Sequence, residues 1–219
     1  MDKRINIIVG HYGSGKTEFA LNLAFKLKEK YEKVYIIDLD IVNPYFRTAD
    51  VKDKLIDAGI IPICSEFACT NVDIPALPAD IMRVFNDKDA AVVFDVGGDD
   101  DGAIALGRYK EYFEAEAYEL LFIINTCRPL TKTAEDIKDM INAINVVSRL
   151  KVTGLVNNTN LAGETSVKTL MSGHDEVLKA SDDTGICLKY ISGTEEVISA
   201  LSRDLKNKAF TLKRYILMG

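Results

Sequence analysis

The stretch Gly10-His11-Tyr12-Gly13-Ser14-Gly15-Lys16-Thr17 decides the fold of this chain. It fills every fixed position of the pattern G-x-x-x-x-G-K-[ST], the Walker A motif. The apolar run at residues 5–9 predicts a buried strand before it, and residues 18–25 predict a helix after it. A strand, a glycine-rich turn and a helix start, in this order, present backbone N–H groups and the positive end of a helix dipole to a phosphate. The sequence therefore predicts a phosphate-binding loop at residues 10–17, called the P-loop below.

Each position of the P-loop has an expected role. Its glycines let the backbone approach phosphate oxygens without a Cβ clash. Lys16 is expected to neutralise the β- and γ-phosphates and to act in catalysis, and the Thr17 hydroxyl is expected to ligate Mg²⁺. The nucleotide-binding residues that we predict here are Gly10, Tyr12, Gly13, Ser14, Gly15, Lys16, Thr17 and Glu18.

Apolar runs and amphipathic segments alternate along the whole chain, which predicts a mostly parallel twisted sheet with helices on both faces. We expect an α/β fold of three layers and one domain over residues 1–219. The predicted strands are residues 5–9, 33–37, 60–64, 90–94, 119–125, 152–157 and 186–191. The predicted helices are residues 18–25, 48–58, 79–85, 102–115, 131–149, 165–180 and 194–217.

Composition excludes several classes of function. The chain has 219 residues and a net charge of −6, which disfavours non-specific binding to nucleic acid or to an anionic membrane. No apolar run is long enough to span a bilayer, and residues 1–4 lead into a strand without a signal-peptide core, so we expect a cytoplasmic protein. The four cysteines form no C-x-x-C pair, which favours buried or free thiols over a metal site; they are Cys64, Cys69, Cys127 and Cys187.

Three aspartates follow predicted strands and are the candidates for holding Mg²⁺ with Thr17. Ligands of open α/β sheets bind at the carboxyl ends of the strands, where Asp38, Asp40 and Asp95 lie. Asp95 matches a Walker B aspartate, which holds water molecules of the metal. Of the other two, we favour Asp40 as the catalytic residue that orients or activates the attacking water, with Asp38 supporting Mg²⁺ or Lys16.

Gly97 and Gly98 follow the Walker B aspartate. A backbone N–H at Gly97 could contact the γ-phosphate and release it after hydrolysis, as in a nucleotide switch. A simple turn before the next helix is the alternative.

At this point the chain resembles the MinD/ParA-type P-loop ATPases, of the CobQ/CobB/MinD/ParA nucleotide-binding family. GHYGSGKTEFALNLA, the strand that ends in DLD, and VVFDVGG occur in that family's order and approximate spacing. The resemblance implies ATP and Mg²⁺ as ligands, with Asp40 as the water-positioning residue and Asp95 as the Walker B residue. It also implies ATP-dependent dimerisation and a timing role with a protein partner. The family's signature lysine, which reaches the partner's nucleotide, is His11 here, so a homodimer stays open.

The strand end at residues 155–160 bears on the choice of base. GTPases place N-K-x-D there, because a carboxylate accepts both guanine N1–H and N2–H. This chain has N-N-x-N, and its last residue, Asn160, can accept only one of those groups. Asn157 resembles the family's adenine-contacting asparagine. The pattern favours ATP over GTP.

The basic, amphipathic C-terminus at residues 205–216 predicts an ordinary terminal helix that covers the sheet, rather than a membrane anchor. We therefore expect a slow Mg²⁺–ATP hydrolase that serves as a switch or as a maturation or assembly factor for an unidentified protein. Two alternatives stay open. One is an ATP-dependent ligase or kinase on a small molecule, as in the amidase and dethiobiotin synthetase relatives. The other is a nucleotide-binding interaction module with little turnover.

Overall fold

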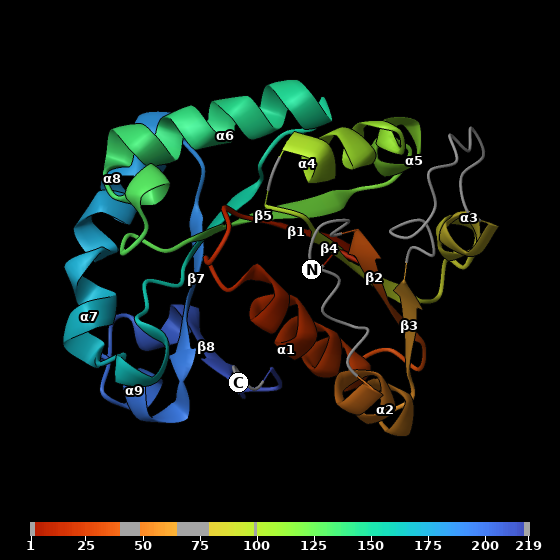
Figure 1. Cartoon of the computed structure of the whole chain (residues 1–219), viewed down its shortest axis with the longest axis horizontal. Helices are drawn as coiled ribbons and strands as arrows, with labels where there is room; N and C mark the ends of the chain where they lie inside the picture. The colour runs from red at the N-terminus through yellow and green to blue at the C-terminus, as the bar shows by residue number, and fades with distance from the viewer. Residues whose placement is uncertain (1–2, 40–48, 65–78, 99, 217–219) are drawn as a thin grey trace.

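A parallel β-sheet forms the centre of the fold, which is known here from a computed structural model (Figure 1). The structure describes residues 3–39, 49–64, 79–98 and 100–216. Within these ranges the sheet has eight strands in the order β3-β2-β4-β1-β5-β6-β7-β8, and every neighbouring pair is parallel. The strands are β1 (Ile5–Val9), β2 (Val34–Leu39), β3 (Ile60–Cys64), β4 (Ala91–Val96), β5 (Tyr118–Ile124), β6 (Gly154–Asn157), β7 (Leu188–Thr194) and β8 (Ala209–Leu212).

Helices cover both faces of this sheet, which gives the three layers that the sequence predicts. Figure 1 shows α4, α5 and α6 over one face and α1 and α2 over the other. The helices are α1 (Lys16–Lys28), α2 (Ala49–Asp57), α3 (Ala79–Asn86), α4 (Asp100–Gly107), α5 (Lys110–Glu114), α6 (Ala134–Ser148), α7 (Val167–Ser172), α8 (His174–Thr184) and α9 (Glu195–Ser199). Short 3₁₀ turns are η3 (Pro129–Thr131), η4 (Ala162–Glu164) and η5 (Lys206–Lys208).

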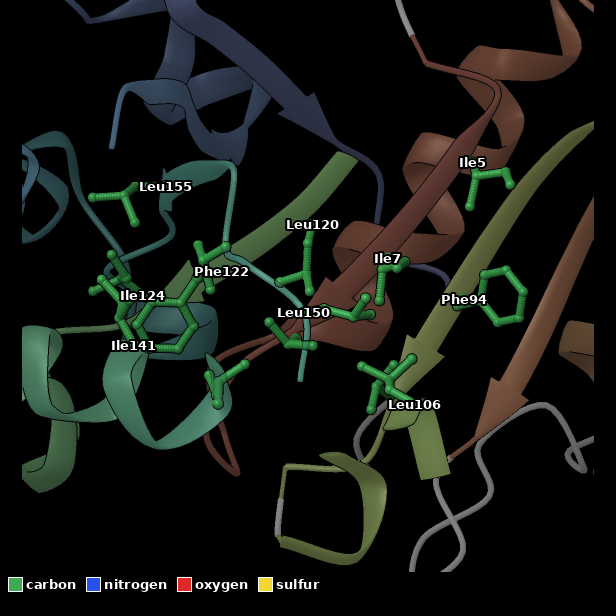
Figure 2. Packing of buried hydrophobic residues seen from close by; sticks show 14 of the residues in the cluster. Ile5, Ile7, Phe94, Leu106, Leu120, Phe122, Ile124, Ile141, Leu150 and Leu155 are labelled. Atoms are coloured by element: carbon green, nitrogen blue, oxygen red, sulfur yellow. The ribbon is translucent and has the colours of Figure 1, made fainter. Parts of the chain in front are cut away.

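The core has two halves, one on each face of the sheet, because successive strand residues point to opposite faces. On β1, Ile5 and Ile7 pack with the helices from α3 to α9, whereas Ile8 packs with α1 and α2. Figure 2 shows part of the first half, in which Ile7, Leu120 and Phe122 of the central strands lie near Leu106 of α4 and Ile141 of α6. All residues of β1, β2 and β4 are buried, as expected for strands that are covered on both faces.

Several predicted helices are interrupted. The segment at 102–115 forms α4 and α5, separated by residues 108–109, and the segment at 165–180 forms α7 and α8, separated at Gly173. An added Cβ at Gly173 would lie 2.0 Å from Thr126 Oγ1 and 2.6 Å from Thr159 Oγ1, so the chain passes too close to these side chains for a larger residue. A regular helical pattern in the sequence does not show this close approach.

The prediction of a helix over residues 194–217 is wrong. Of the described residues 194–216, only Glu195–Ser199 is α-helical, and Ala209–Leu212 forms β8, an additional strand parallel to β7. Phe210 is buried against Phe19 of α1, with ring centroids 4.6 Å apart, so its burial is satisfied by an extended chain. Sheet pairing with β7 therefore overrides the amphipathic pattern of this segment.

The C-terminal segment then runs along α1. Asn22 of α1 donates to the carbonyl oxygen of Lys213 and accepts from its N–H, both at 2.8 Å. The ring of Tyr215 stacks on Phe25, with centroids 4.5 Å apart. The helix that follows the P-loop is thus held from both the sheet and the end of the chain. Among the described residues, no helix combines the length and apolar character needed to cross a membrane.

Candidate nucleotide-binding site

The P-loop lies between β1 and α1, at the carboxyl end of the central strand. Gly13 and Gly15 have φ values of 75° and 85°, which glycine adopts without the Cβ clash of other residues. Gly15 is the N-cap of α1, and its side-chain position is closed by Asn158, whose Nδ2 would lie 2.5 Å from an added Cβ. These two glycines are therefore needed for the turn itself.

The start of α1 fits an anion. The loop presents a helix N-terminus, where backbone N–H groups lack partners within the helix. Lys16 and Thr17 are each only 5% exposed, and Ser14 Oγ is a buried hydroxyl without a hydrogen-bond partner in the described part of the chain. A ligand oxygen would complete the bonding of such groups. The residues present thus fit a bound phosphate.

Two buried carboxylates lie on one side of the P-loop, and we call Asp38 of β2 and Asp95 of β4 the acidic flank. They are 2% and 1% exposed, and they are direct register partners on neighbouring strands. Ile36 and Val93, two residues earlier on each strand, pack with α1, so strand alternation places both carboxylates on the α1 face of the sheet. Lys16 and Thr17 begin that helix. The structure therefore brings these predicted site residues to one edge of the sheet.

Oxygen donors of this kind suit Mg²⁺, which is commonly held by one or two carboxylates together with substrate phosphates. In the ranges that the structure describes, no group of three or more His, Cys, Asp or Glu side chains is arranged to hold a metal ion. Asp40, the predicted catalytic aspartate, lies outside the described residues. The metal-binding roles of Thr17, Asp38 and Asp95 stay predictions.

Gly98, two residues after the end of β4, passes directly against the P-loop. An added Cβ at Gly98 would lie 2.7 Å from the backbone nitrogen of Tyr12 and 3.0 Å from the carbonyl oxygen of Gly10. Because backbone touches backbone here, a shift of the segment after β4 must move the P-loop or be blocked by it. The predicted contact of Gly97 with a nucleotide is untested.

Three side chains on the other side of the P-loop donate hydrogen bonds to its carbonyl oxygens, and we call Asn125, Arg128 and Asn158 the donor flank. Asn125 Nδ2 and Arg128 Nε donate to the carbonyl oxygen of Gly13, at 3.3 and 3.2 Å. Asn158 Nδ2 donates to that of Ser14 at 2.7 Å. A carbonyl that is held outward in this way leaves the N–H groups of the loop for the ligand.

The sequence did not identify these three residues. Asn125 and Arg128 follow β5, and Asn158 follows β6, so each lies next to a strand end that adjoins β1 or β5 in the sheet. For Asn125 the available signal was a polar residue directly after an apolar run, the same signal that identifies Asp95. Asn158 is the second polar residue after such a run, and Arg128 stands further along its turn without this signal.

Asn157 is placed differently from its neighbour Asn158, which bonds to the P-loop. Its side chain is fully buried: the Oδ1 atom accepts from Thr159 N–H and Oγ1, and Nδ2 lies 3.4 Å from the carbonyl oxygen of Leu170 and 3.5 Å from His174 Nδ1. Burial lowers the pKa of His174, which keeps this contact neutral. A contact between Asn157 and a base would have to break these bonds. The base contact of Asn157 stays a prediction, and the structure places Asn158 rather than Asn157 against the P-loop.

Glu18 directly follows the P-loop, whereas Tyr12 and His11 lie within it. Glu18 accepts hydrogen bonds from the backbone N–H groups of Tyr215 and Ile216, so its carboxylate holds the C-terminal segment. Burial raises the pKa of the Glu18 carboxyl, and these two hydrogen bonds oppose the rise. Tyr12 is 62% exposed, and His11 Nδ1 lies 3.1 Å from the carbonyl oxygen of Tyr12. The predicted nucleotide contacts of Tyr12 and Glu18 stay predictions. Backbone N–H groups could make these contacts without the two side chains.

The sequence model of the CobQ/CobB/MinD/ParA nucleotide binding domain matches residues 5–207. The chain belongs to this family. The match spans the P-loop, both flanks and all the strands except β8. No curated protein sequence matches the chain.

Solved structures with the same fold include two FtsY proteins. The cell division protein FtsY of Thermotoga maritima is 18% identical, with a TM-score of 0.54, over 90% of this chain and 64% of that one. Chloroplast FtsY of Physcomitrella patens is 16% identical, with a TM-score of 0.57, over 85% of this chain and 57% of that one. This chain thus spans less than two thirds of either protein. FlhF in complex with GTP and Mg²⁺ is 15% identical, with a TM-score of 0.55, over 90% of this chain and 68% of that one.

The structure describes the side chains of two of the four cysteines. Cys127 and Cys187 are free and exposed. The side chains of Cys64 and Cys69 lie outside the described part of the structure.

Proposed function

We propose that this protein binds Mg²⁺–ATP and hydrolyses it slowly in the cytoplasm, as a nucleotide-dependent switch or assembly factor for a protein partner. The observation that carries this proposal is the position of the P-loop. It begins α1 between two buried carboxylates on one side and three hydrogen-bond donors on the other. A triphosphate requires a metal-holding side and a rigid N–H cradle, and this arrangement supplies groups for both.

The roles of the residues follow from their chemistry. The bound Mg²⁺–nucleotide supplies an electrophilic γ-phosphorus and part of the charge neutralisation. Lys16 places its ammonium group at the β- and γ-phosphates, and the Thr17 hydroxyl ligates the metal. Asp95 accepts hydrogen bonds from water on the metal, and Asp38 contributes negative charge beside it. Asp40 orients the attacking water.

The coupling to a partner is proposed to run through Gly97 and Gly98. The backbone of Gly98 lies against the P-loop, so a γ-phosphate contact at Gly97 would be transmitted to α4, which starts three residues after Gly97. The partner would be a second copy of the chain or another protein. It would bind this surface in one nucleotide state and not in the other. His11 in place of the family's signature lysine leaves a dimer to be tested rather than assumed.

ATP is proposed rather than GTP because the base-side strand end offers amides instead of a carboxylate. An asparagine amide can accept one of the two guanine N–H groups that an aspartate accepts together. The structure adds that Asn160 Oδ1 already accepts from the N–H of Ala162, at 3.2 Å. That acceptor is therefore less available to guanine.

Calorimetry and a phosphate-release assay test the proposal. Wild-type protein should bind ATP more tightly than GTP, with Mg²⁺ strengthening binding, and should release phosphate slowly without a phosphorylated or ligated product. Lys16→Ala should bind ATP at least about tenfold more weakly, because a charged donor to phosphate contributes at least that factor in affinity. Lys179→Ala, which removes an exposed lysine from α8, is the matched control and should bind as wild type. Equal affinity of the Lys16→Ala and wild-type proteins for ATP would refute the assignment.

A further inference from the structure

Arg128 is an exposed residue whose guanidinium group lies against the P-loop. Its Nε donates to the carbonyl oxygen of Gly13 at 3.2 Å. A Cβ added at Gly13 would lie 2.8 Å from Nε, 3.0 Å from Cζ and 3.1 Å from Nη2. The guanidinium group therefore packs directly against the loop backbone, in space that only glycine at position 13 leaves free.

The turn that carries Arg128 is firmly anchored. The N–H of Arg128 donates to the carbonyl oxygen of Asn125 at 3.0 Å, and the buried Thr131 hydroxyl donates to the same oxygen at 2.8 Å. Pro129 is the first residue of η3, and Arg128 is its N-cap. The Arg128 side chain is nevertheless exposed, and among the described residues its one hydrogen bond is to Gly13. An anchored turn thus holds an exposed guanidinium group against the P-loop at Gly13.

The sheet order tells which part of a nucleotide would lie near Arg128. The acidic flank is on β4 and β2, on one side of β1, and it suits the metal and the terminal phosphates. Arg128 follows β5, on the opposite side, together with Asn158 after β6. A triphosphate with its γ-phosphate toward the acidic flank must direct its base toward β5 and β6.

We propose that Arg128 stacks its guanidinium plane on the nucleobase and so contributes to nucleotide affinity through the base rather than the phosphates. This inference rests on the proposed function and adds a base-binding residue to it. Guanidinium groups stack well on aromatic faces, and the base is the aromatic part of the ligand. The hydrogen bond from Nε to Gly13 orients the plane without using the two terminal nitrogens.

Binding of three ligands separates a base contact from a phosphate contact. ATP, ADP and inorganic tripolyphosphate are titrated, each with Mg²⁺, into wild-type protein and Arg128→Ala. Stacking of one base contributes about 1–3 kcal/mol, so Arg128→Ala should weaken ATP and ADP binding by the same factor of about tenfold. Tripolyphosphate, which has no base, should lose clearly less affinity than ATP, and any loss reports only the hydrogen bond from Arg128 to Gly13.

Two further variants complete the design. Lys132→Ala removes a positive charge from an exposed residue of the same segment and should change none of the three affinities. Arg128→Lys keeps the charge but not the plane, and it should recover only part of the lost ATP affinity. Thermal unfolding of each variant checks that the fold is retained.

Several outcomes would overturn the inference. Equal loss of tripolyphosphate and ATP binding in Arg128→Ala would show that Arg128 acts on the phosphates or on the shape of the loop. Full rescue by Arg128→Lys would show that charge alone suffices, and unchanged ATP affinity in Arg128→Ala would show no contact. If wild-type protein bound neither ATP nor tripolyphosphate, the proposed function would fail first, which is a distinct result.

Discussion

The two flanks of the P-loop are suited to different roles. The acidic flank, Asp38 and Asp95, is buried on the α1 face of the sheet, whereas the donor flank bonds directly to two carbonyl oxygens of the loop. The first flank is suited to act on a metal ion and on the reacting phosphate. The second holds the loop in its binding shape before a ligand arrives. Damage to the acidic flank should therefore change chemistry, and damage to the donor flank should change binding and stability.

Asp95→Asn tests the acidic flank and has the largest expected effect. The substitution keeps the shape of a buried side chain but removes the charge that would hold water on the metal. Loss of such an outer-shell contact typically costs about 10–100-fold, so the rate of phosphate release at saturating ATP should fall by that factor. ATP affinity measured with chelator in place of Mg²⁺ should stay close to wild type.

The matched control for this variant is Asp53→Asn, an exposed aspartate of α2, which should hydrolyse ATP at the wild-type rate. A wild-type rate for Asp95→Asn would remove this residue from the metal site. An equal loss of binding with and without Mg²⁺ would instead give it a role in the loop, and the contrast between the flanks would disappear.

Asn158→Ala tests the donor flank and should give a smaller change of another kind. The variant leaves the carbonyl oxygen of Ser14 and the hydroxyl of Ser192 without their bonds to Asn158, which are 2.7 and 2.9 Å long. A buried polar group left unpaired costs about 1–3 kcal/mol, so the free energy of unfolding should fall within that range. ATP and tripolyphosphate should both bind about tenfold more weakly, because the loop loses part of its fixed shape.

Urea unfolding and calorimetry measure the two effects of Asn158→Ala. Asn207→Ala, which removes an exposed amide of η5, is the control. If Asn158→Ala lowered stability but left both affinities unchanged, the donor flank would be structural only. A selective loss of ATP but not tripolyphosphate would move Asn158 into contact with the base.

The difference between the flanks also explains how much of the site the sequence could predict. The P-loop and Asp95 are contiguous motifs, in which a residue's role follows from its immediate neighbours. The donor flank joins residues 112–144 positions apart, and no local pattern records which strand end will lie beside the loop. Asn157 and Asn158 illustrate this limit, since strand alternation sends one toward His174 and the other toward Ser14.

The fold, like the site, was predictable from sequence only where a local pattern determines the structure. Alternation of apolar and amphipathic segments predicted the parallel sheet and its two helical layers, because those patterns report burial along each element. It failed at β8, where Phe210 and its neighbours read as one face of a helix. Pairing of their backbone with β7 and the bonds from Asn22 decide the structure there, and neither is visible in local sequence.

Glu116→Gln changes a residue that belongs to neither flank, and it has the smallest expected effect of these variants. Arg4, directly before β1, forms an ion pair with Glu116 through two nitrogens, at 2.6 and 2.7 Å, at the end of the sheet away from the P-loop. The hydrogen bond from Arg4 lowers the pKa of the Glu116 carboxyl below its ordinary value. A lowered folded-state pKa means that the stabilisation is present above the unfolded pKa, near 4.5, and is lost as pH falls through the folded value.

Glu116→Gln should therefore lower the free energy of unfolding by about 1 kcal/mol at pH 7, with the difference from wild type shrinking below pH 4.5. ATP affinity should not change, because the pair touches neither flank. Urea unfolding over a pH series measures the first effect, and Glu114→Gln, at an exposed glutamate of α5, serves as control. A difference that grew on acidification would contradict the sign of the pKa shift. A loss of ATP affinity would show that the loop depends on anchoring at both ends of β1, so that the donor flank alone does not hold its shape.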